Sequence, residues 1–283
     1  MRARRYHRQW HGNGNGNVSF LSRLHPMTLA ILSALPEEQA GLTDLLTHKE
    51  LTTHAGRRFV TGLVLGQPVV LALSGIGKVA AATTSTALIE RFGAKRIVFT
   101  GVAGGVGAGV QVGDVVLGTH YVQHDMDASP LFPRFEVPLY GAANFTANAD
   151  LIATLFIAAY AHFQRVSGQF DSKNRIKNRP GQGVVHRGLI ASGDRFVSSA
   201  REAHALCVAL PEALCVEMEG AAVAQVCHDY AIPFAALRTI SDRADDNAHV
   251  DFPVFVRDVA GPQALSILRL WLQAQFNSTP VNA

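Results

Sequence analysis

The sequence predicts an α/β fold in which helices cover both faces of a central, twisted, mixed β-sheet, giving three layers. Apolar runs of strand length alternate with longer segments of helical pattern, and this alternation is typical of layered α/β domains. Two of the apolar runs lead into acidic side chains, Glu219 and Asp242. Buried carboxylates are costly unless paired or functional, and ligands of such sheets bind beyond the carboxyl ends of the strands. The two acids therefore indicate a site.

Composition and charge exclude several classes of protein. With 283 residues, 48% of them hydrophobic and 17% charged, the chain can bury a large core. Much of the net charge of +3 comes from arginines in the first 26 residues, so no nucleic-acid surface is expected. We expect neither a membrane span nor a signal peptide, because no apolar run has the required length or position. The three cysteines lack CxxC spacing, which favours reduced thiols in the cytoplasm.

Residues 1–26 differ in composition from everything that follows. Arginines lead into a stretch that alternates glycine and asparagine, and such a composition does not bury a core. We therefore expect residues 1–26 to be a disordered basic extension. Residues 27–283 contain neither a repeat nor a linker and are predicted to form one domain.

The first half of that domain is predicted to begin with a strand over residues 29–34. A helix is expected over residues 36–47, because Pro36 suits a first helical turn. Residues 58–65 and 68–73 read as paired strands around Gly66 and Gln67, and the alanine-rich segment 77–92 reads as a helix.

The next elements follow from the same patterns. Residues 96–100 are predicted to be a strand that leads into a glycine-rich turn over residues 101–107. Another strand is expected to start with residues 114–118. Residues 148–163 are expected to form a helix, in which Asn148 caps the first turn.

The last third contains the remaining elements. A loop is expected over residues 167–183, and a strand over residues 184–192. Val216 lies at the end of a further strand, which turns into a helix that runs to Tyr230. Residues 232–237 are predicted to be a buried strand, and residues 255–275 an amphipathic helix.

Several positions could carry chemistry, and each has a simpler structural interpretation. Glu38 follows the first strand, where it can face a pocket, or it can favour the positive end of a helix dipole. The same two interpretations apply to Glu219. Phe196 precedes Val197 in a loop, an arrangement that suits an aromatic platform beside a backbone that reads a base edge, although a core phenylalanine is the commoner case.

No cofactor or metal is expected. The glycines of residues 101–107 are not spaced as G-x-G-x-x-G, and no Lys-Ser/Thr pair follows them, so neither NAD binding nor ATP hydrolysis is predicted. The two HxxxH pairs, His7 with His11 and His120 with His124, lack the glutamate of HExxH. In a strand, positions i and i+4 lie about 13 Å apart, too far to share a metal.

A series of short motifs, taken in order, resembles one family. The motifs are Ala34-Leu35-Pro36-Glu37-Glu38, Ser74-Gly75-Ile76-Gly77-Lys78, Thr100-Gly101-Val102-Ala103-Gly104-Gly105, Val112-Gly113-Asp114, Ser192-Gly193-Asp194-Arg195-Phe196-Val197, Val216-Glu217-Met218-Glu219 and Ser241-Asp242. Their order is similar to that in 5′-methylthioadenosine/S-adenosylhomocysteine nucleosidases, of the nucleoside phosphorylase superfamily. The resemblance spans about residues 28 to 260 and implies a nucleoside phosphorylase-like fold.

The resemblance implies hydrolysis of the bond between adenine and the ribosyl carbon, through an oxocarbenium-like transition state. Asp242 would protonate adenine N7, with Ser241 orienting it, and would need a pKa raised toward neutrality. Glu38 would activate the attacking water. Glu219 would accept hydrogen bonds from the 2′- and 3′-hydroxyls, with Met218 beneath the sugar.

The same resemblance assigns the rest of the pocket and an assembly. Phe196 would stack on adenine, the Val197 backbone would bind its Watson–Crick edge, and the Gly104 backbone would line the ribosyl side. Ile76 and Phe252 would form an apolar wall for the 5′-alkylthio group. Ala128 and Pro138 lie where a neighbouring subunit closes that pocket in the family, which implies a homodimer. Val102 stands where serine or threonine is common, which puts substrate preference in question.

Three alternatives remain open on the sequence alone. A phosphate-dependent purine nucleoside phosphorylase would need arginines beside the glycine-rich segments, and residues 75–78 and 101–107 contain none. A non-catalytic nucleoside-binding protein could lose Glu38 or Asp242, and both are present. A nucleosidase for another 5′-substituted adenosine, such as 5′-deoxyadenosine or aminodeoxyfutalosine, would share every motif.

Overall fold

The computed structural model of the chain describes residues 28–168, 183–244 and 252–277. The predicted extension over residues 1–26 lies outside the described residues. Most of the predicted loop over residues 167–183 also lies outside them. Within the described ranges, no helix has the length and apolar character needed to cross a membrane.

A ten-stranded mixed sheet forms the centre of the molecule. Its strands are β1 (Leu29–Ser33), β2 (Thr47–His54), β3 (Arg57–Val64), β4 (Gln67–Leu73), β5 (Arg96–Gly105), β6 (Val115–Gln123), β7 (Asn144–Thr146), β8 (Val185–Ser192), β9 (Ala213–Glu217) and β10 (Phe234–Asp242). The strand order is β10-β6-β8-β9-β5-β1-β4-β3-β2, with β7 paired to β6. β1 runs parallel to both β4 and β5, and its five residues are all buried, as expected for a central parallel strand.

One half of the sheet closes on itself. β5 pairs with β10 in parallel, β10 pairs with β6, β6 with β8, β8 with β9, and β9 returns to β5. This closure brings the carboxyl ends of β5, β8, β9 and β10 to one place, although they are distant in sequence.

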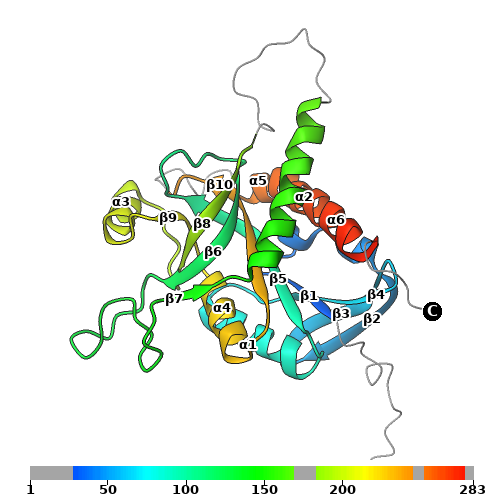
Figure 1. The fold of residues 1–283 in the computed structure, drawn as a ribbon, viewed down its shortest axis with the longest axis horizontal. Coiled ribbons are helices and arrows are strands. Elements are labelled where there is room, and N and C mark those ends of the chain that lie inside the picture. The colour runs from blue at the N-terminus through cyan, green and yellow to red at the C-terminus, as the bar shows by residue number, and fades with distance from the viewer. Residues whose placement is uncertain (1–27, 169–182, 245–251, 278–283) are drawn as a thin grey trace, which may run out of the picture.

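Helices cover both faces of the sheet (Figure 1). The helices α1 (Lys78–Glu90) and α4 (Gly220–Asp229) contribute Leu88 and Val223 to the apolar core on one face. The helices α2 (Ala149–Gly168) and α6 (Gly261–Asn277) contribute Leu155 and Trp271 to the core on the other. The shorter α3 (Ala200–Ala209) packs through Leu206 against a third cluster. The predicted three-layer α/β/α arrangement is confirmed.

Most predicted elements occur within a few residues of their expected bounds. The predicted cap is also confirmed, because Asn148 Oδ1 accepts a 2.9 Å hydrogen bond from the Leu151 N–H.

The helix predicted for residues 36–47 was wrong. The chain forms two short 3₁₀ turns, Glu37–Gln39 and Thr43–Leu45, and then enters β2. Gly41 separates the two turns with φ of +78°, a left-handed conformation that ends a right-handed helix.

Two further boundaries differ from the prediction. The glycine-rich segment predicted as a turn instead continues β5 to Gly105, because strands on both sides pair with it. The last helix begins earlier, as α5 (Phe252–Phe255), and passes through a wider π-helical turn, Val256–Ala260, before α6. Pro262 follows that turn and lacks an N–H to donate, which disfavours regular α-helical bonding there. Strands β2 and β7 and helix α3 were not predicted.

Candidate active site

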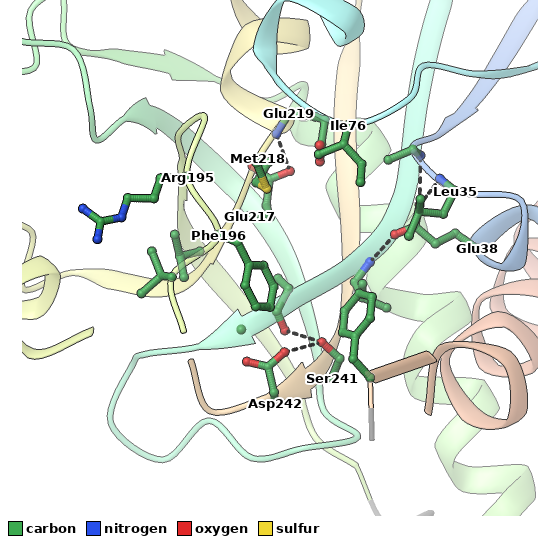
Figure 2. A pocket seen from close by; sticks show the side chains of 17 residues that line it. Leu35, Glu38, Ile76, Arg195, Phe196, Glu217, Met218, Glu219, Ser241 and Asp242 are labelled. Carbon is green, nitrogen blue, oxygen red and sulfur yellow. Dashed lines mark hydrogen bonds between the residues drawn. The ribbon is translucent and has the colours of Figure 1, made fainter. Parts of the chain in front are cut away.

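A cavity of about 140 Å³ lies at the carboxyl ends of the strands, on the side predicted for a ligand. All ten predicted site residues line it: Glu38, Ile76, Gly104, Phe196, Val197, Met218, Glu219, Ser241, Asp242 and Phe252. They come from seven separate segments of the chain, and Figure 2 shows their side chains around the pocket. The fold therefore brings the predicted site together as one pocket.

Glu38 is 6% exposed and is held by three backbone N–H groups. Its Oε2 accepts hydrogen bonds of 2.8 Å from Ala34 and from Leu35, and its Oε1 accepts one of 3.1 Å from Val102. Burial raises the pKa of this carboxyl, and the charge of Arg238 and the three N–H groups act in the opposite direction. The short 3₁₀ turn has little dipole of its own, so the helix-start interpretation does not account for this placement.

Close approach of backbone explains two glycines of β5. A Cβ on Gly101 would lie 2.8 Å from Glu38 Oε1, and a Cβ on Gly104 would lie 2.9 Å from Asp242 Oδ1. Larger residues at these positions would displace the carboxyl groups. The glycine-rich segment is thus a strand that lets two acids approach the sheet.

Asp242 ends β10 at a point where the pairing with β5 shifts register, after Ile240. Its Oδ2 accepts a 2.7 Å hydrogen bond from the Ser241 hydroxyl, and its Oδ1 accepts one of 2.7 Å from the Ala244 N–H. The predicted contact between Ser241 and Asp242 is therefore present. Figure 2 shows this pair on a different side of the pocket from Glu38.

Glu219 does not cap the helix that it precedes. It occupies the N-cap position of α4 without a side-chain cap bond, and its Oε1 instead accepts a 2.8 Å hydrogen bond from the Gly77 N–H. Burial raises the pKa of Glu219 to about 8, and the charge of Glu217 acts in the same direction. The folded state therefore favours the protonated form of this carboxyl more than the unfolded state does.

Glu217 and Arg238 form a buried ion pair that the sequence analysis did not assign to the site. Arg238 Nη2 lies 2.7 Å from Glu217 Oε2, and their side chains are 1% and 2% exposed. Glu217 also caps α4, since it accepts hydrogen bonds from the Gly220 N–H, and the Ser192 hydroxyl donates to it. A buried arginine needs an acidic partner, because an unpaired buried charge is costly. Arg238 directly follows an apolar strand run in the sequence, so this requirement could have predicted a buried acid such as Glu217 beside it.

Aromatic and apolar side chains also line the cavity. The Phe196 ring meets the Phe252 ring edge-on, with centroids 6.2 Å apart. Phe196 is 44% and Ile76 58% exposed, so neither is a core residue. Val197, by contrast, is buried in the cluster that includes Leu206. The alternative interpretation of Phe196 as a core phenylalanine was wrong.

Cations are scarce around the pocket. Among the described residues that line it, Arg195 is the one cation, and its guanidinium contacts Glu202. The described part of the chain contains no group of three or more His, Cys, Asp or Glu side chains that could hold a metal. Val102 lines the cavity with an apolar side chain. Ala128 and Pro138 are not among the lining residues of this single chain.

Comparison with known proteins agrees with this geometry. Residues 28–272 match the model of a family described as the phosphorylase superfamily. A 5′-methylthioadenosine/S-adenosylhomocysteine nucleosidase of Anoxybacillus flavithermus is 35% identical over 235 residues, which cover 83% of this chain and 93% of the relative. A nucleosidase of the same name from Neisseria meningitidis has been solved in complex with methylthio-immucillin-A. Its structure superposes on this one with a TM-score of 0.75 at 33% identity, and the match covers 87% of this chain and 99% of that chain. A futalosine hydrolase of Helicobacter pylori gives a TM-score of 0.76 at 30% identity, with coverage of 88% and 98%.

Proposed function

Since the chain belongs to the phosphorylase superfamily, in the branch of purine nucleosidases that includes methylthioadenosine/adenosylhomocysteine nucleosidases and futalosine hydrolases, we propose a specific reaction for it. The proposed reaction is the hydrolysis of 5′-methylthioadenosine and S-adenosylhomocysteine. The products would be adenine and the 5-thio-substituted ribose. The observation that carries the proposal is the convergence of Glu38, Glu219 and Asp242 on one cavity that also contains an exposed aromatic ring.

The proposed chemistry assigns a separate task to each acid. Asp242 donates a proton to adenine N7 as the glycosidic bond breaks, so the leaving group departs neutral. Water adds its oxygen to the ribosyl carbon, and Glu38 accepts the proton that the water loses. Two of the N–H groups that hold Glu38 belong to the turn after β1 and one to β5, which supports a fixed orientation toward the cavity. Glu219 binds the ribose hydroxyls.

Recognition of the base would depend on Phe196 and Val197. A purine stacked on the Phe196 ring would place its edge beside the Val197 backbone. Adenine accepts a hydrogen bond at N1 and donates one from its 6-amino group, which matches a backbone N–H and C=O. A 6-oxopurine presents the reverse pattern at these two atoms, so the same backbone would favour adenine.

The 5′-substituent would meet an apolar surface. Ile76 and Phe252 line the cavity, and the side chain of Val102 adds a further apolar group. A thioether substituent suits such a surface, because it contributes apolar area and needs no strong hydrogen bond. This lining supports a thioether at the 5′ position, which both proposed substrates share.

Phosphorolysis fits the pocket less well. A phosphate would need charge-assisted donors, whereas the one cation among the described lining residues already contacts Glu202. The ionised Glu38 would also repel an anion beside the ribosyl carbon. A purely binding protein would not require both Glu38 and Asp242.

The active species in this proposal is a cytoplasmic homodimer. Leu131 and Leu139 are 84% and 92% exposed in the segment that contains Ala128 and Pro138. A second copy could cover these apolar side chains while Ala128 and Pro138 complete its neighbour's pocket. All three cysteines are free, as suits a reducing compartment.

The decisive experiment measures base release from a panel of nucleosides, with and without phosphate. The panel contains 5′-methylthioadenosine, S-adenosylhomocysteine, 5′-deoxyadenosine, aminodeoxyfutalosine and futalosine. We expect the two thio-substituted adenosines to give the highest kcat/KM, with no sugar 1-phosphate formed. Preference for futalosine would replace the proposed substrate, and a sugar 1-phosphate product would replace hydrolysis by phosphorolysis. Sedimentation at the assay concentration tests the dimer, which active monomers would contradict.

A further inference from the structure

Three residues from separate parts of the chain close a cycle of hydrogen bonds at the edge of the pocket. The Lys78 N–H donates to Asp194 Oδ1 at 2.7 Å, and the Asp194 N–H donates to Asp125 Oδ2 at 2.9 Å. Lys78 Nζ then donates to Asp125 Oδ1 at 2.6 Å. We call Lys78, Asp125 and Asp194 the loop clamp. None of its members lines the cavity.

The loop clamp joins two walls of the site. Lys78 begins α1 directly after the loop that carries Ile76, and Asp194 lies two residues before Phe196. Ile76 and Phe196 are 58% and 44% exposed, so packing alone restrains their side chains weakly. Figure 2 shows them on different segments that border the pocket. The hydrogen bonds of the loop clamp are therefore the restraint on the distance between the loop that carries Ile76 and the loop that carries Phe196.

The loop clamp is itself anchored to the rest of the fold. Lys78 Nζ also donates to Gln123 Oε1 at 3.1 Å, at the end of β6, and Gln123 Nε2 donates to Gln225 Oε1 of α4 at 2.7 Å. The Lys78 side chain is only 15% exposed. A partly buried ammonium with two oxygen partners has little freedom to move.

The start of α1 explains why an oxygen acceptor suits position 194. The amides of the N-cap residue and of the first helical residue are each bound by an acid: Glu219 accepts from the Gly77 N–H, and Asp194 accepts from the Lys78 N–H. Gly77 has a φ of +98°, and a Cβ there would lie 3.1 Å from Asp194 Oδ1. The loop before α1 is thus held by two acids from different segments of the chain, Glu219 and Asp194.

We propose that the loop clamp is a positioning unit, which fixes Ile76 relative to Phe196 and thereby sets how tightly the site holds a 5′-substituted adenosine. This inference rests on the proposed function for the identity of the ligand. The loop clamp touches neither reacting atom, so its loss should weaken substrate and transition state alike. Such a change raises KM and leaves kcat nearly unchanged.

Asparagine substitutions distinguish this geometry from a simple effect of charge. Asp194 uses one oxygen to accept one hydrogen bond, and Asp194→Asn keeps such an oxygen. Asp125 uses both oxygens to accept from two different donors, and Asp125→Asn must turn its amide N–H₂ toward one of them. The two variants remove the same charge, yet only Asp125→Asn breaks the cycle.

The test compares wild type with Asp194→Asn, Asp194→Ala and Asp125→Asn, and uses Asp44→Ala as a control for loss of a surface acid away from the cavity. We expect Asp125→Asn and Asp194→Ala to raise KM for the best nucleoside of the panel about tenfold, the effect of one charge-assisted hydrogen bond. Asp194→Asn and Asp44→Ala should retain the wild-type KM. Equal KM values for Asp125→Asn and Asp194→Asn would overturn the proposal.

A second measurement does not depend on catalysis. In Asp125→Asn the remaining oxygen should stay with the charged Lys78 ammonium, so the N–H₂ group faces the Asp194 N–H. Hydrogen exchange of the Asp194 amide should therefore be faster in Asp125→Asn than in wild type, because that amide loses its acceptor. Unchanged exchange would also overturn the proposal. A wild-type protein that releases no base from any panel nucleoside would refute the proposed function, and the exchange measurement would still decide whether the loop clamp exists. Thermal unfolding of each variant checks that it is folded.

Discussion

Gly104 and Asp242 lie opposite each other where β5 and β10 pair, and the absent side chain of one makes room for the carboxyl of the other. A Cβ on Gly104 would lie 2.9 Å from Asp242 Oδ1 and equally close to the Cβ of Ala244. Side chains do not tolerate such contacts without displacement. The position of the proposed general acid therefore depends on a glycine of a different strand.

Gly104→Ala should lower adenine release through displacement of Asp242. A misplacement of about 1 Å in an active site can reduce the rate on the order of 10²-fold. We expect kcat to fall by about that factor in a protein that still unfolds cooperatively. Steady-state kinetics and thermal unfolding on the same preparation check this, and a folded variant with wild-type kcat would contradict the proposed dependence.

Asp242→Asn should nearly abolish hydrolysis and leave binding measurable. The variant loses the proton donor, and general acid catalysis contributes about 10²–10⁴ in rate. Ser241→Ala is the matched comparison: it removes the 2.7 Å hydrogen bond to Asp242 but keeps the acid, so its loss of rate should be smaller. Single-turnover adenine release measures both. Equal losses in the two variants would show that Asp242 is not the proton donor.

Glu38→Gln should reduce kcat by about 10²–10⁴, because the amide cannot accept the proton that the attacking water loses. Burial raises the pKa of Glu38 above its ordinary value of 4.5. Since the base acts in its ionised form, kcat/KM of the wild type should fall as pH decreases, with the acid limb above pH 4.5. A pH profile of both proteins tests this. Retention of the acid limb in Glu38→Gln would assign it to another group.

Arg238→Met should destabilise the protein strongly, because it leaves Glu217 buried without its 2.7 Å partner. Loss of one partner of a buried ion pair typically reduces the free energy of unfolding by about 3–5 kcal/mol. The control is Arg257→Met, whose exposed pair with Asp258 should contribute no measurable stability. Urea unfolding at neutral pH compares the two. Similar midpoints for both variants would refute the structural importance of the buried pair.

The pKa of Glu219 predicts a specific dependence of stability on pH. Its pKa rises from an ordinary 4.5 to about 8, chiefly through burial, so between these values the folded state holds a proton that the unfolded state has lost. This contribution is complete below pH 4.5 and is lost as pH increases toward 8. Glu219→Gln, which does not titrate, should lose less stability over that range. Parallel curves for the two proteins would contradict the assignment.

Local signals in the sequence were sufficient for much of the fold and the pocket. Apolar runs of strand length identified β1, β3, β4 and β10, and the family resemblance carried by the ordered motifs supplied the ten residues that were expected at the cavity. These signals are local because burial and the turn residues act over a few neighbouring positions. They failed at residues 36–47, whose composition is typical of one helix. In the structure, Gly41 has a positive φ and separates two short turns.

By itself, the sequence determined the α/β class, the chemical types of the site residues and their order along the chain. Only the tertiary structure decided how these groups act on one another. Glu217, not Glu219, caps α4, and Arg238 meets it from another strand. Lys78, Asp125 and Asp194 join loops that are far apart in sequence. A carboxylate takes its role from its burial and from the donors around it, and both depend on strand pairing between distant segments.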